Sequence, residues 1–173
     1  MHVSNWLAVL PACLAVCAPA FGQDTARDDA VAQIMQADRD FAALAAEAGV
    51  RTAFETYMDP AEGHLINGTP APLVGQEDIG ASFAAWPDGL LLHWEPETGF
   101  ASEAGDFGAS WGIWSIHPDG DPASAPAGRG TYVTVWRRDA AGNWRGLLDM
   151  GTDDPSYRPS APPADSNDRP DDD

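Results

Sequence analysis

The amino-acid sequence predicts an α+β fold in which helices come first and an antiparallel sheet follows. In the first half of the chain, apolar residues recur every three or four positions, as they do on one face of a helix. In the second half, β-branched and aromatic residues fill runs that turn residues separate. Helices grouped before strands are typical of the α+β class. The 173 residues are enough for one domain with its own core.

The first helix is expected over residues 25–48. Ile34, Phe41 and Ala45 recur at helical spacing and form one apolar stripe. Asp38 falls inside this stripe, on the face that should be buried. Because a buried carboxylate is costly without a partner, Asp38 is a candidate functional residue.

Shorter elements are expected next in the chain. Thr25 is a candidate N-cap for the first helix, and Gly49 is placed to end it. Residues 50–58 and 76–86 each carry apolar side chains on one side, which predicts two further helices. Between them, residues 64–67 are expected to form a brief strand. The first half should therefore be helical, with little strand.

Four longer strands are expected in the second half, over residues 90–102, 107–117, 131–138 and 144–150. Following one another with turns between them, they should form an antiparallel meander. Large apolar side chains occupy both odd and even positions within residues 111–116. Both faces of that strand should then be covered, one by the helices and the other by a second subunit. We therefore expect a homodimer through the sheet.

The last two strands should form a hairpin over residues 130–151, joined by a turn at residues 139–143. Asp149 lies near the end of the second strand, between Leu148 and Met150. A charge in such an apolar run is costly unless it faces a pocket, water or a partner. Asp149 is therefore the second candidate functional residue.

The two ends of the chain are expected to lie outside the folded domain. Residues 1–22 are typical of a signal peptide, because an apolar run too short to span a bilayer is followed by small residues. An uncleaved anchor is the alternative. The domain itself should occupy residues 23–152, and residues 153–173 should form a disordered acidic tail. The mature protein is expected to be secreted or periplasmic.

Composition excludes several classes of function. Both cysteines, Cys13 and Cys17, lie in the predicted signal peptide, so the mature chain should have neither thiol catalysis nor a disulfide. A lipoprotein acylated at Cys17 is disfavoured by the bulky Val16 before it. The formal charge is −18, and all nine basic residues are arginines. Nucleic acid and anionic membranes are therefore not expected partners.

No cofactor motif is present in the sequence. His64, His93 and His117 are far apart and have no cysteine to assist them, so no metal site is expected. Ser110 and Ser115 lack the sequence context of a nucleophile elbow, and no run matches a phosphate-binding loop. We expect no cofactor.

Several segments together resemble one known family. They are residues 38–44 with Gly49, 74–79, 94–96, 105–112, 132–137 and 143–149. In combination they resemble the domain-of-unknown-function 4440 family, over about residues 28–152. That family is similar to the nuclear transport factor 2-like (NTF2-like) superfamily, which includes SnoaL-like polyketide cyclases and ketosteroid isomerases.

The resemblance implies a cone-shaped fold. A curved antiparallel sheet would wrap around the long N-terminal helix and leave an apolar, ligand-binding cavity at its wide end. The resemblance does not imply a reaction, because such folds carry enzymes, binding proteins and non-catalytic modules. No local pattern around Asp38, His64 or Asp149 matches the catalytic carboxylates of ketosteroid isomerases.

Three residues are candidate acid–base groups in such a cone. Asp38 and Asp149 can both line the cavity as a carboxylate pair, in which burial and mutual repulsion raise at least one pKa. His64, next to the short first strand, can reach the cavity mouth. The structural alternatives are loop amides that bind Asp38, and an ion pair between Asp149 and Arg137 or another arginine.

The candidate ligand-binding residues are apolar or aromatic: Phe41, Phe54, Tyr57, Met58, Trp111 and Trp136. Core and interface packing is the alternative for these side chains. The leading interpretation is an exported domain that binds a small apolar or amphipathic molecule. The alternatives are a cofactor-independent isomerase, cyclase or dehydratase-like enzyme, and a non-catalytic structural or interaction domain.

Overall fold

In a computed structural model, the chain is described over residues 21–159. Its elements are α1 (Phe21–Ala48), α2 (Val50–Tyr57), β1 (His64–Ile66), β2 (Leu73–Val74), α3 (Gly75–Ser82), β3 (Leu91–Ala101), β4 (Phe107–His117), β5 (Gly128–Arg138) and β6 (Trp144–Asp153). Residues 1–20 of the predicted signal peptide and 160–173 of the predicted tail lie outside the described residues. Within residues 21–159, no helix is both long and apolar enough to cross a membrane.

The strands form one six-stranded mixed sheet in the order β2-β1-β6-β5-β4-β3. β3 to β6 form the predicted antiparallel meander. The expectation of a four-stranded sheet was incomplete, because β1 joins it parallel to β6 and β2 pairs antiparallel with β1. With three and two residues respectively, β1 and β2 are too short to show a strand period in the sequence.

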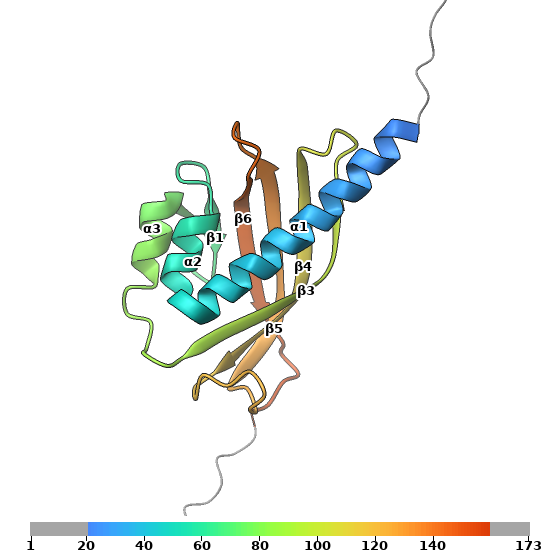
Figure 1. The fold of residues 1–173 in the computed structure, drawn as a ribbon. Helices are drawn as coiled ribbons and strands as arrows, with labels where there is room; N and C mark the ends of the chain where they lie inside the picture. Colours follow the sequence, from blue (N-terminus) through green and yellow to red (C-terminus); the bar gives the residue numbers. More distant parts are fainter. Residues whose placement is uncertain (1–20, 160–173) are drawn as a thin grey trace, which may run out of the picture.

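The helices cover one face of the sheet. α1 runs across the concave face as one long rod, and α2 and α3 lie together beside β1 (Figure 1). The apolar stripe of α1 faces inward, so Ile34 and Phe41 are buried in the core. The Phe41 ring lies edge-on to Trp94 of β3, with 4.8 Å between ring centroids. The predicted α+β cone is confirmed in this arrangement.

Two predicted helix ends were wrong. α1 begins at Phe21, so Thr25 lies inside the helix rather than at its N-cap. α3 ends at Ser82, and the chain continues in turns whose hydrogen bonds join residues three positions apart, such as the bond from the Phe83 N–H to the Gly80 carbonyl. The end of α1 at Gly49 is as expected, because Gly49 adopts a φ of 90° that favours glycine.

Alternation along β4 decides which side chains reach the interior. Trp114 and Ile116 point to the concave face, whereas Trp111 and Ile113 point to the convex face, where they are 40% and 39% exposed. β3, at the edge of the sheet, changes register between Pro96 and Thr98. Such a bulge bends a strand and increases its twist.

Candidate functional site

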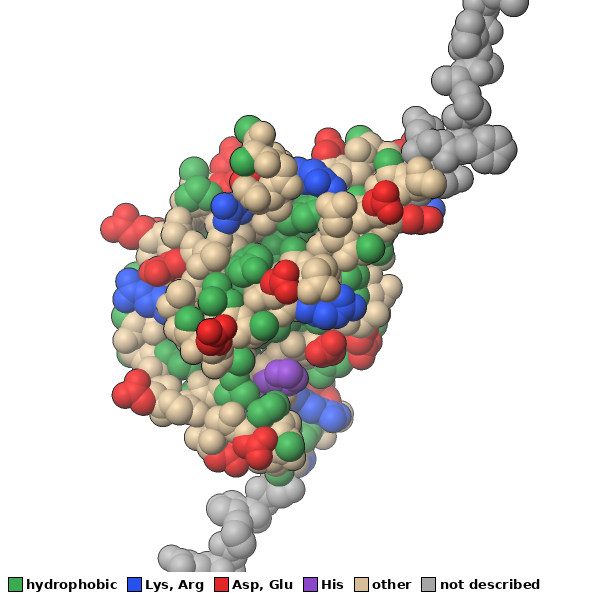
Figure 2. All heavy atoms as spheres, in the orientation of Figure 1, with side chains coloured by type: hydrophobic (Ala, Val, Ile, Leu, Met, Phe, Trp, Pro, Cys, Tyr) green, Lys and Arg blue, Asp and Glu red, His purple; other side chains and the backbone are tan. Residues whose placement is uncertain are grey.

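A cavity of about 480 Å³ lies between the concave face of the sheet and the α2–α3 layer. Its lining residues are Phe54, Leu65, Asn67, Gly68, Phe83, Trp86, Leu92, Trp94, Trp114, Ile116, Tyr132, Asp149, Gly151, Thr152 and Asp153. The exposed residues of this set, among them Asn67 and Thr152, mark the mouth of the cavity. The space-filling view shows charged side chains scattered over the helix-covered face, without one dominant patch (Figure 2).

Two tryptophans on neighbouring strands form the sheet side of the cavity. Trp94 of β3 is paired directly with Trp114 of β4. Trp114 lies over Gly130, where an added Cβ atom would come within 2.8 Å of the indole ring. It also lies over Gly151, where the corresponding distance is 3.3 Å. Glycine at these two positions therefore leaves the space that the indole of Trp114 occupies.

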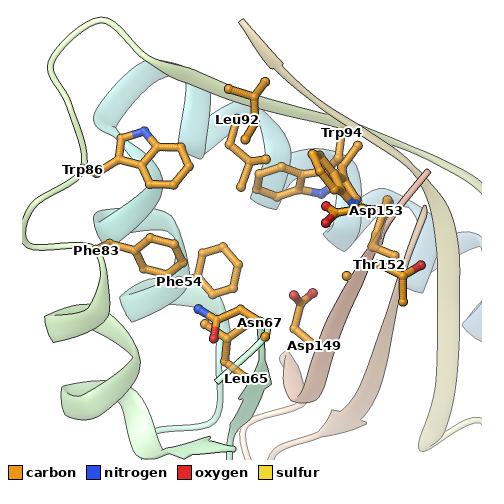
Figure 3. A pocket seen from close by; sticks show the side chains of 15 residues that line it. Phe54, Leu65, Asn67, Phe83, Trp86, Leu92, Trp94, Asp149, Thr152 and Asp153 are labelled. Carbon is orange, nitrogen blue, oxygen red and sulfur yellow. The ribbon is translucent and has the colours of Figure 1, made fainter. Parts of the chain in front are cut away.

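Three aromatic side chains from the helical layer form the opposite wall. Phe54 of α2 contacts Phe83, with ring centroids 4.7 Å apart, and Phe83 contacts Trp86 at 5.8 Å. Phe83 and Trp86 follow α3 in the tight turns that end it. Figure 3 shows these rings facing the space into which Asp149 points.

Asp149 supplies a carboxyl group inside this aromatic cavity. It lies on β6 between Leu65 of β1 and Thr134 of β5. The Thr134 hydroxyl donates a hydrogen bond of 2.7 Å to Asp149 Oδ2. Burial raises the pKa of Asp149 to about 7; the Thr134 hydrogen bond opposes this shift, and the negative charge of Asp38 adds to it. The carboxyl group is therefore able to exchange a proton near neutral pH.

The predicted alternative for Asp149, an ion pair with Arg137, is not formed. Arg137 instead contacts Asp59 at 3.0 Å and Glu62 at 2.6 Å. Among the ion pairs within residues 21–159, none includes Asp149. Its charge is therefore not compensated by a neighbouring arginine.

Asp38 is fully buried and does not line the cavity. Its carboxylate accepts hydrogen bonds from Trp94 Nε1 at 2.9 Å, Ser110 Oγ at 2.6 Å and the Tyr132 hydroxyl at 2.9 Å. Burial raises the pKa of Asp38, and these three hydrogen bonds oppose the shift. The donors are side chains, not the loop amides that the structural alternative assumed.

Tyr132 lines the cavity and also reaches the buried Asp38. Its ring lines the cavity, while its hydroxyl group donates to Asp38. Burial and the Asp38 carboxylate raise the pKa of Tyr132, so the phenol stays protonated. Asp38 and Asp149 therefore influence each other electrostatically but do not share the cavity as the predicted carboxylate pair.

His64 lies on β1 and is not part of the cavity lining. Its Nδ1 atom is 2.8 Å from the carbonyl oxygen of Glu62, which holds the ring near the preceding loop. The next residue, Leu65, does line the cavity. The predicted cavity residue on β1 was therefore one position too early. Neighbouring side chains in a strand point to opposite faces of the sheet, so His64 and Leu65 lie on different faces.

The predicted ligand-binding residues are divided between the cavity, the core and the far face of the sheet. Phe54 lines the cavity. Phe41, Met58 and Trp136 are buried in the core, and half-buried Tyr57 stacks on Phe41 with ring centroids 5.1 Å apart. Trp111 points to the convex face, as described above.

The cavity residues that sequence reasoning missed are mainly Trp94, Trp114 and Tyr132. A usable signal was present, because Tyr132 and Thr134 lie on the same side of β5 by simple alternation. The hairpin register sets Thr134 opposite Asp149. Extending that register to β4 would have identified Trp114, rather than Trp111, as the tryptophan on the cavity side.

Within residues 21–159, no group of three or more histidine, cysteine, aspartate or glutamate side chains is arranged to hold a metal ion. The cavity itself offers the Asp149 carboxyl group among aromatic rings, with Asp153 exposed at its mouth. The Asp149 carboxyl group can anchor a polar group of a ligand, or exchange a proton with one.

Comparisons with known proteins agree on the architecture. No protein-family model matches the chain, and no match was found among curated proteins. An NTF2-like protein of unknown function from Pseudomonas putida is similar in structure, with a TM-score of 0.59 and 14% sequence identity over 72% of this chain and 87% of that one.

Two further solved structures are similar. An NTF2-like protein with a cystatin-like fold from Novosphingobium aromaticivorans has a TM-score of 0.55 and 16% identity, over 69% of this chain and 79% of that one. A ketosteroid isomerase-like protein from Erwinia carotovora atroseptica has a TM-score of 0.57 and 14% identity, over 73% of this chain and 97% of that one. At these identities the likeness concerns the fold. The chain has the NTF2-like, cystatin-like fold.

Proposed function

We propose that this domain binds one small, apolar or amphipathic molecule in its aromatic cavity, with Asp149 as the polar anchor. The observation that carries the proposal is the carboxyl group of Asp149, with its raised pKa, in a cavity lined by six aromatic side chains; the second acid of the lining, Asp153, is exposed. Largely apolar pockets with a few polar groups are typical of small-molecule sites. The volume of about 480 Å³ lies within the usual range for such sites and argues against a purely structural, filled cone.

An enzyme is the second candidate, and the raised pKa of Asp149 favours it. A carboxyl group with a pKa of about 7 suits proton transfer near neutral pH, as in an isomerase, cyclase or dehydratase-like reaction. One similar structure is named as ketosteroid isomerase-like. Asp149 would have to act without Asp38 and His64, because neither of them lines the cavity. Binding is therefore the leading function.

The proposal also includes the export of the domain and its family. The apolar segment near the N-terminus supports export, with the mature chain beginning at Gln23 and located outside the cytoplasm. The segments that resemble the domain-of-unknown-function 4440 family support membership in that family. A mature N-terminus other than Gln23, found by intact mass, would contradict the proposed cleavage site.

The binding proposal is tested with the uncharged fluorescent probe N-phenyl-1-naphthylamine. We expect the chain to bind it with a roughly micromolar Kd. Leu92→Trp should fill the cavity and weaken binding roughly tenfold or more. Val74→Trp is the matched control, because the same large side chain is then added to β2, outside the cavity lining, where Val74 is 45% exposed. Equal affinity of the two variants would show that the probe binds elsewhere and would contradict the proposal.

Turnover distinguishes the two candidates. Isomerisation of cyclohex-3-enone to cyclohex-2-enone is followed by absorbance, with the chain and with Asp149→Asn. If the chain accelerates the reaction and Asp149→Asn abolishes turnover while the naphthylamine still binds, the enzyme replaces the binding module as the better interpretation. If neither protein changes the rate, binding stands as the leading function.

A further inference from the structure

We propose that the ligand of this cavity is an organic cation, a protonated amine or quaternary ammonium group on an apolar body. The inference rests on the proposed binding function and adds the chemical class of the ligand. Three independent features of the lining support it. The donors of its aromatic side chains are already bonded to protein acceptors, its charged residues are acidic, and aromatic rings lie on two sides of the cavity.

The hydrogen-bond donors of the aromatic lining are already engaged with protein acceptors. The indole N–H groups of Trp86 and Trp114 donate to the carbonyl oxygens of Leu90, at 2.8 Å, and Thr131, at 3.2 Å. The indole of Trp94 and the hydroxyl of Tyr132 both donate to Asp38. The rings therefore contribute aromatic surface but no free donor. From these rings a neutral carbonyl compound or an anion would gain no hydrogen bond; the other side-chain donors of the lining include the Asn67 amide at the mouth, and Asp149 when it is protonated.

The charged groups of the lining are all acidic. Asp149 and Asp153 are the two charged residues that line the cavity, and no arginine or histidine is among its lining residues within the described range. The nearby Arg129 is paired with Asp154 at 3.0 Å. A cation in the cavity would therefore meet uncompensated negative charge and no competing basic side chain.

Aromatic rings surround the same space. Phe54, Phe83 and Trp86 face it from the helical layer, as Figure 3 shows. Trp94 and Trp114 complete the wall on the sheet side. Aromatic faces attract cations, and the attraction grows when the cation is desolvated. Rings on two sides and a carboxylate below are the combination that recognises an ammonium group on an apolar body.

The protonation of Asp149 separates this proposal from its strongest competitor. On α1 the group whose charge acts on Asp149 is Asp38, and on β5 the groups are Tyr132, whose pKa Asp149 helps to raise, and Thr134, whose hydroxyl donates to Asp149. Asp153 is on the same strand, while β1 and α2 present the uncharged Leu65 and Phe54. A bound cation favours the ionised carboxylate, so affinity should increase with pH. A neutral carbonyl ligand that accepts a proton from Asp149 would bind more tightly at low pH.

The test compares three probes of similar shape and different charge. Benzyltrimethylammonium is the cation, neopentylbenzene is its uncharged carbon isostere, and phenylmethanesulfonate is an anion. Each probe competes with N-phenyl-1-naphthylamine for the full chain at pH 8.5 and at pH 5.5. At pH 8.5 we expect the cation to bind roughly tenfold more tightly than the isostere, and the anion to bind most weakly. At pH 5.5 the cation should lose roughly tenfold in affinity while the isostere is unchanged.

Two variants test whether Asp149 causes the preference for a cation. Asp149→Asn should reduce the preference for the cation over the isostere to roughly threefold or less and should flatten its pH dependence. Asp29→Asn is the matched control, because it removes the same charge from an exposed position on α1 and should change neither result.

The outcomes separate this inference from the proposed function. If the isostere binds as tightly as the cation at pH 8.5 in the unaltered chain, the cavity selects neutral ligands and the inference is wrong while the binding function survives. If none of the probes, including the naphthylamine, binds in a manner sensitive to Leu92→Trp, the binding function itself fails. A preference for the cation that persists in Asp149→Asn would also overturn the assigned role of this carboxyl group.

Discussion

Asp149 belongs to a strand of the sheet, and its carboxyl group faces an apolar cavity. The strand position fixes its direction through pairing with Leu65 and Thr134. The cavity limits its contact with water and thereby raises its pKa to about 7. The same carboxyl group must therefore reduce stability whenever it is ionised without a ligand.

We predict that Asp149 makes the free energy of unfolding fall as the pH rises. The folded pKa of about 7 exceeds the ordinary value of 3.8, so the folded state binds more protons than the unfolded state between these values. Relative to Asp149→Asn, the unaltered chain should lose about 2 to 4 kcal/mol between roughly pH 4 and pH 8. Urea unfolding of both proteins across this range measures the difference. A constant difference would show that Asp149 titrates normally.

At the scale of elements, Asp38 joins the long helix to three strands of the sheet. Its carboxylate accepts hydrogen bonds from Trp94 of β3, Ser110 of β4 and Tyr132 of β5. The Ser110 hydroxyl in turn accepts a hydrogen bond from Trp136 Nε1 at 2.8 Å. Each donor is buried, so the network holds α1 in one position and satisfies polar groups that the core encloses.

Removing this carboxylate should therefore be costly. We expect Asp38→Ala to lower the free energy of unfolding by about 3 to 5 kcal/mol, because three buried donors lose their acceptor. Asp38→Asn should cost less, since one acceptor oxygen remains. Asp40→Ala, an exposed acid on the same helix, should change stability by no more than about 0.5 kcal/mol. Equal losses for the Asp38 and Asp40 variants in urea unfolding would contradict the role of the network.

The elements that the sequence predicted well are those with a long, regular pattern. β4 has its predicted bounds, and β3 lies within one residue of them, because many alternating positions define each strand. The parallel pairing of β1 with β6 was not predicted. It joins residues about 80 positions apart through three residue pairs, and no local pattern specifies such a contact.

The candidate site could be predicted only in part, for a related reason. Asp38 and Asp149 were recognisable because a charge interrupts an apolar pattern. Which of the two acids faces the cavity depends on how closely the surrounding side chains pack. Tyr132 and Ser110 contact Asp38 directly, whereas the side chains around Asp149 leave an open space. This packing is set by contacts between helices and strands, and the spacing of residues within one element does not reveal it.

For the whole molecule, the convex face of the sheet carries four of the five exposed large hydrophobic side chains of the described residues. Phe100 is 63% exposed and Phe107 is 43% exposed, and Trp111 and Ile113 of β4 lie on the same side. Contiguous exposed apolar groups are typical of surfaces that associate. The homodimer expected from the sequence would cover this face.

We predict a dimer that depends on this face. In sedimentation equilibrium the chain should have twice its monomer mass, and Trp111→Lys should raise the dissociation constant roughly tenfold or more, because a buried charge would replace an aromatic contact. Val74→Lys is the control, since Val74 is 45% exposed but lies on β2 at the other edge of the sheet. A monomer mass that does not vary with concentration would rule out the dimer.

The outer edge of β3 has a different consequence for the molecule. This strand is 11 residues long and pairs on one side with β4, which leaves its other edge open as a template for strand addition. Pro96 removes a backbone donor from that edge, the bulge beside it twists the edge, and the exposed Glu95 and Glu97 flank it with negative charge. These three features oppose edge-to-edge polymerisation and help an open sheet to remain dispersed at high concentration.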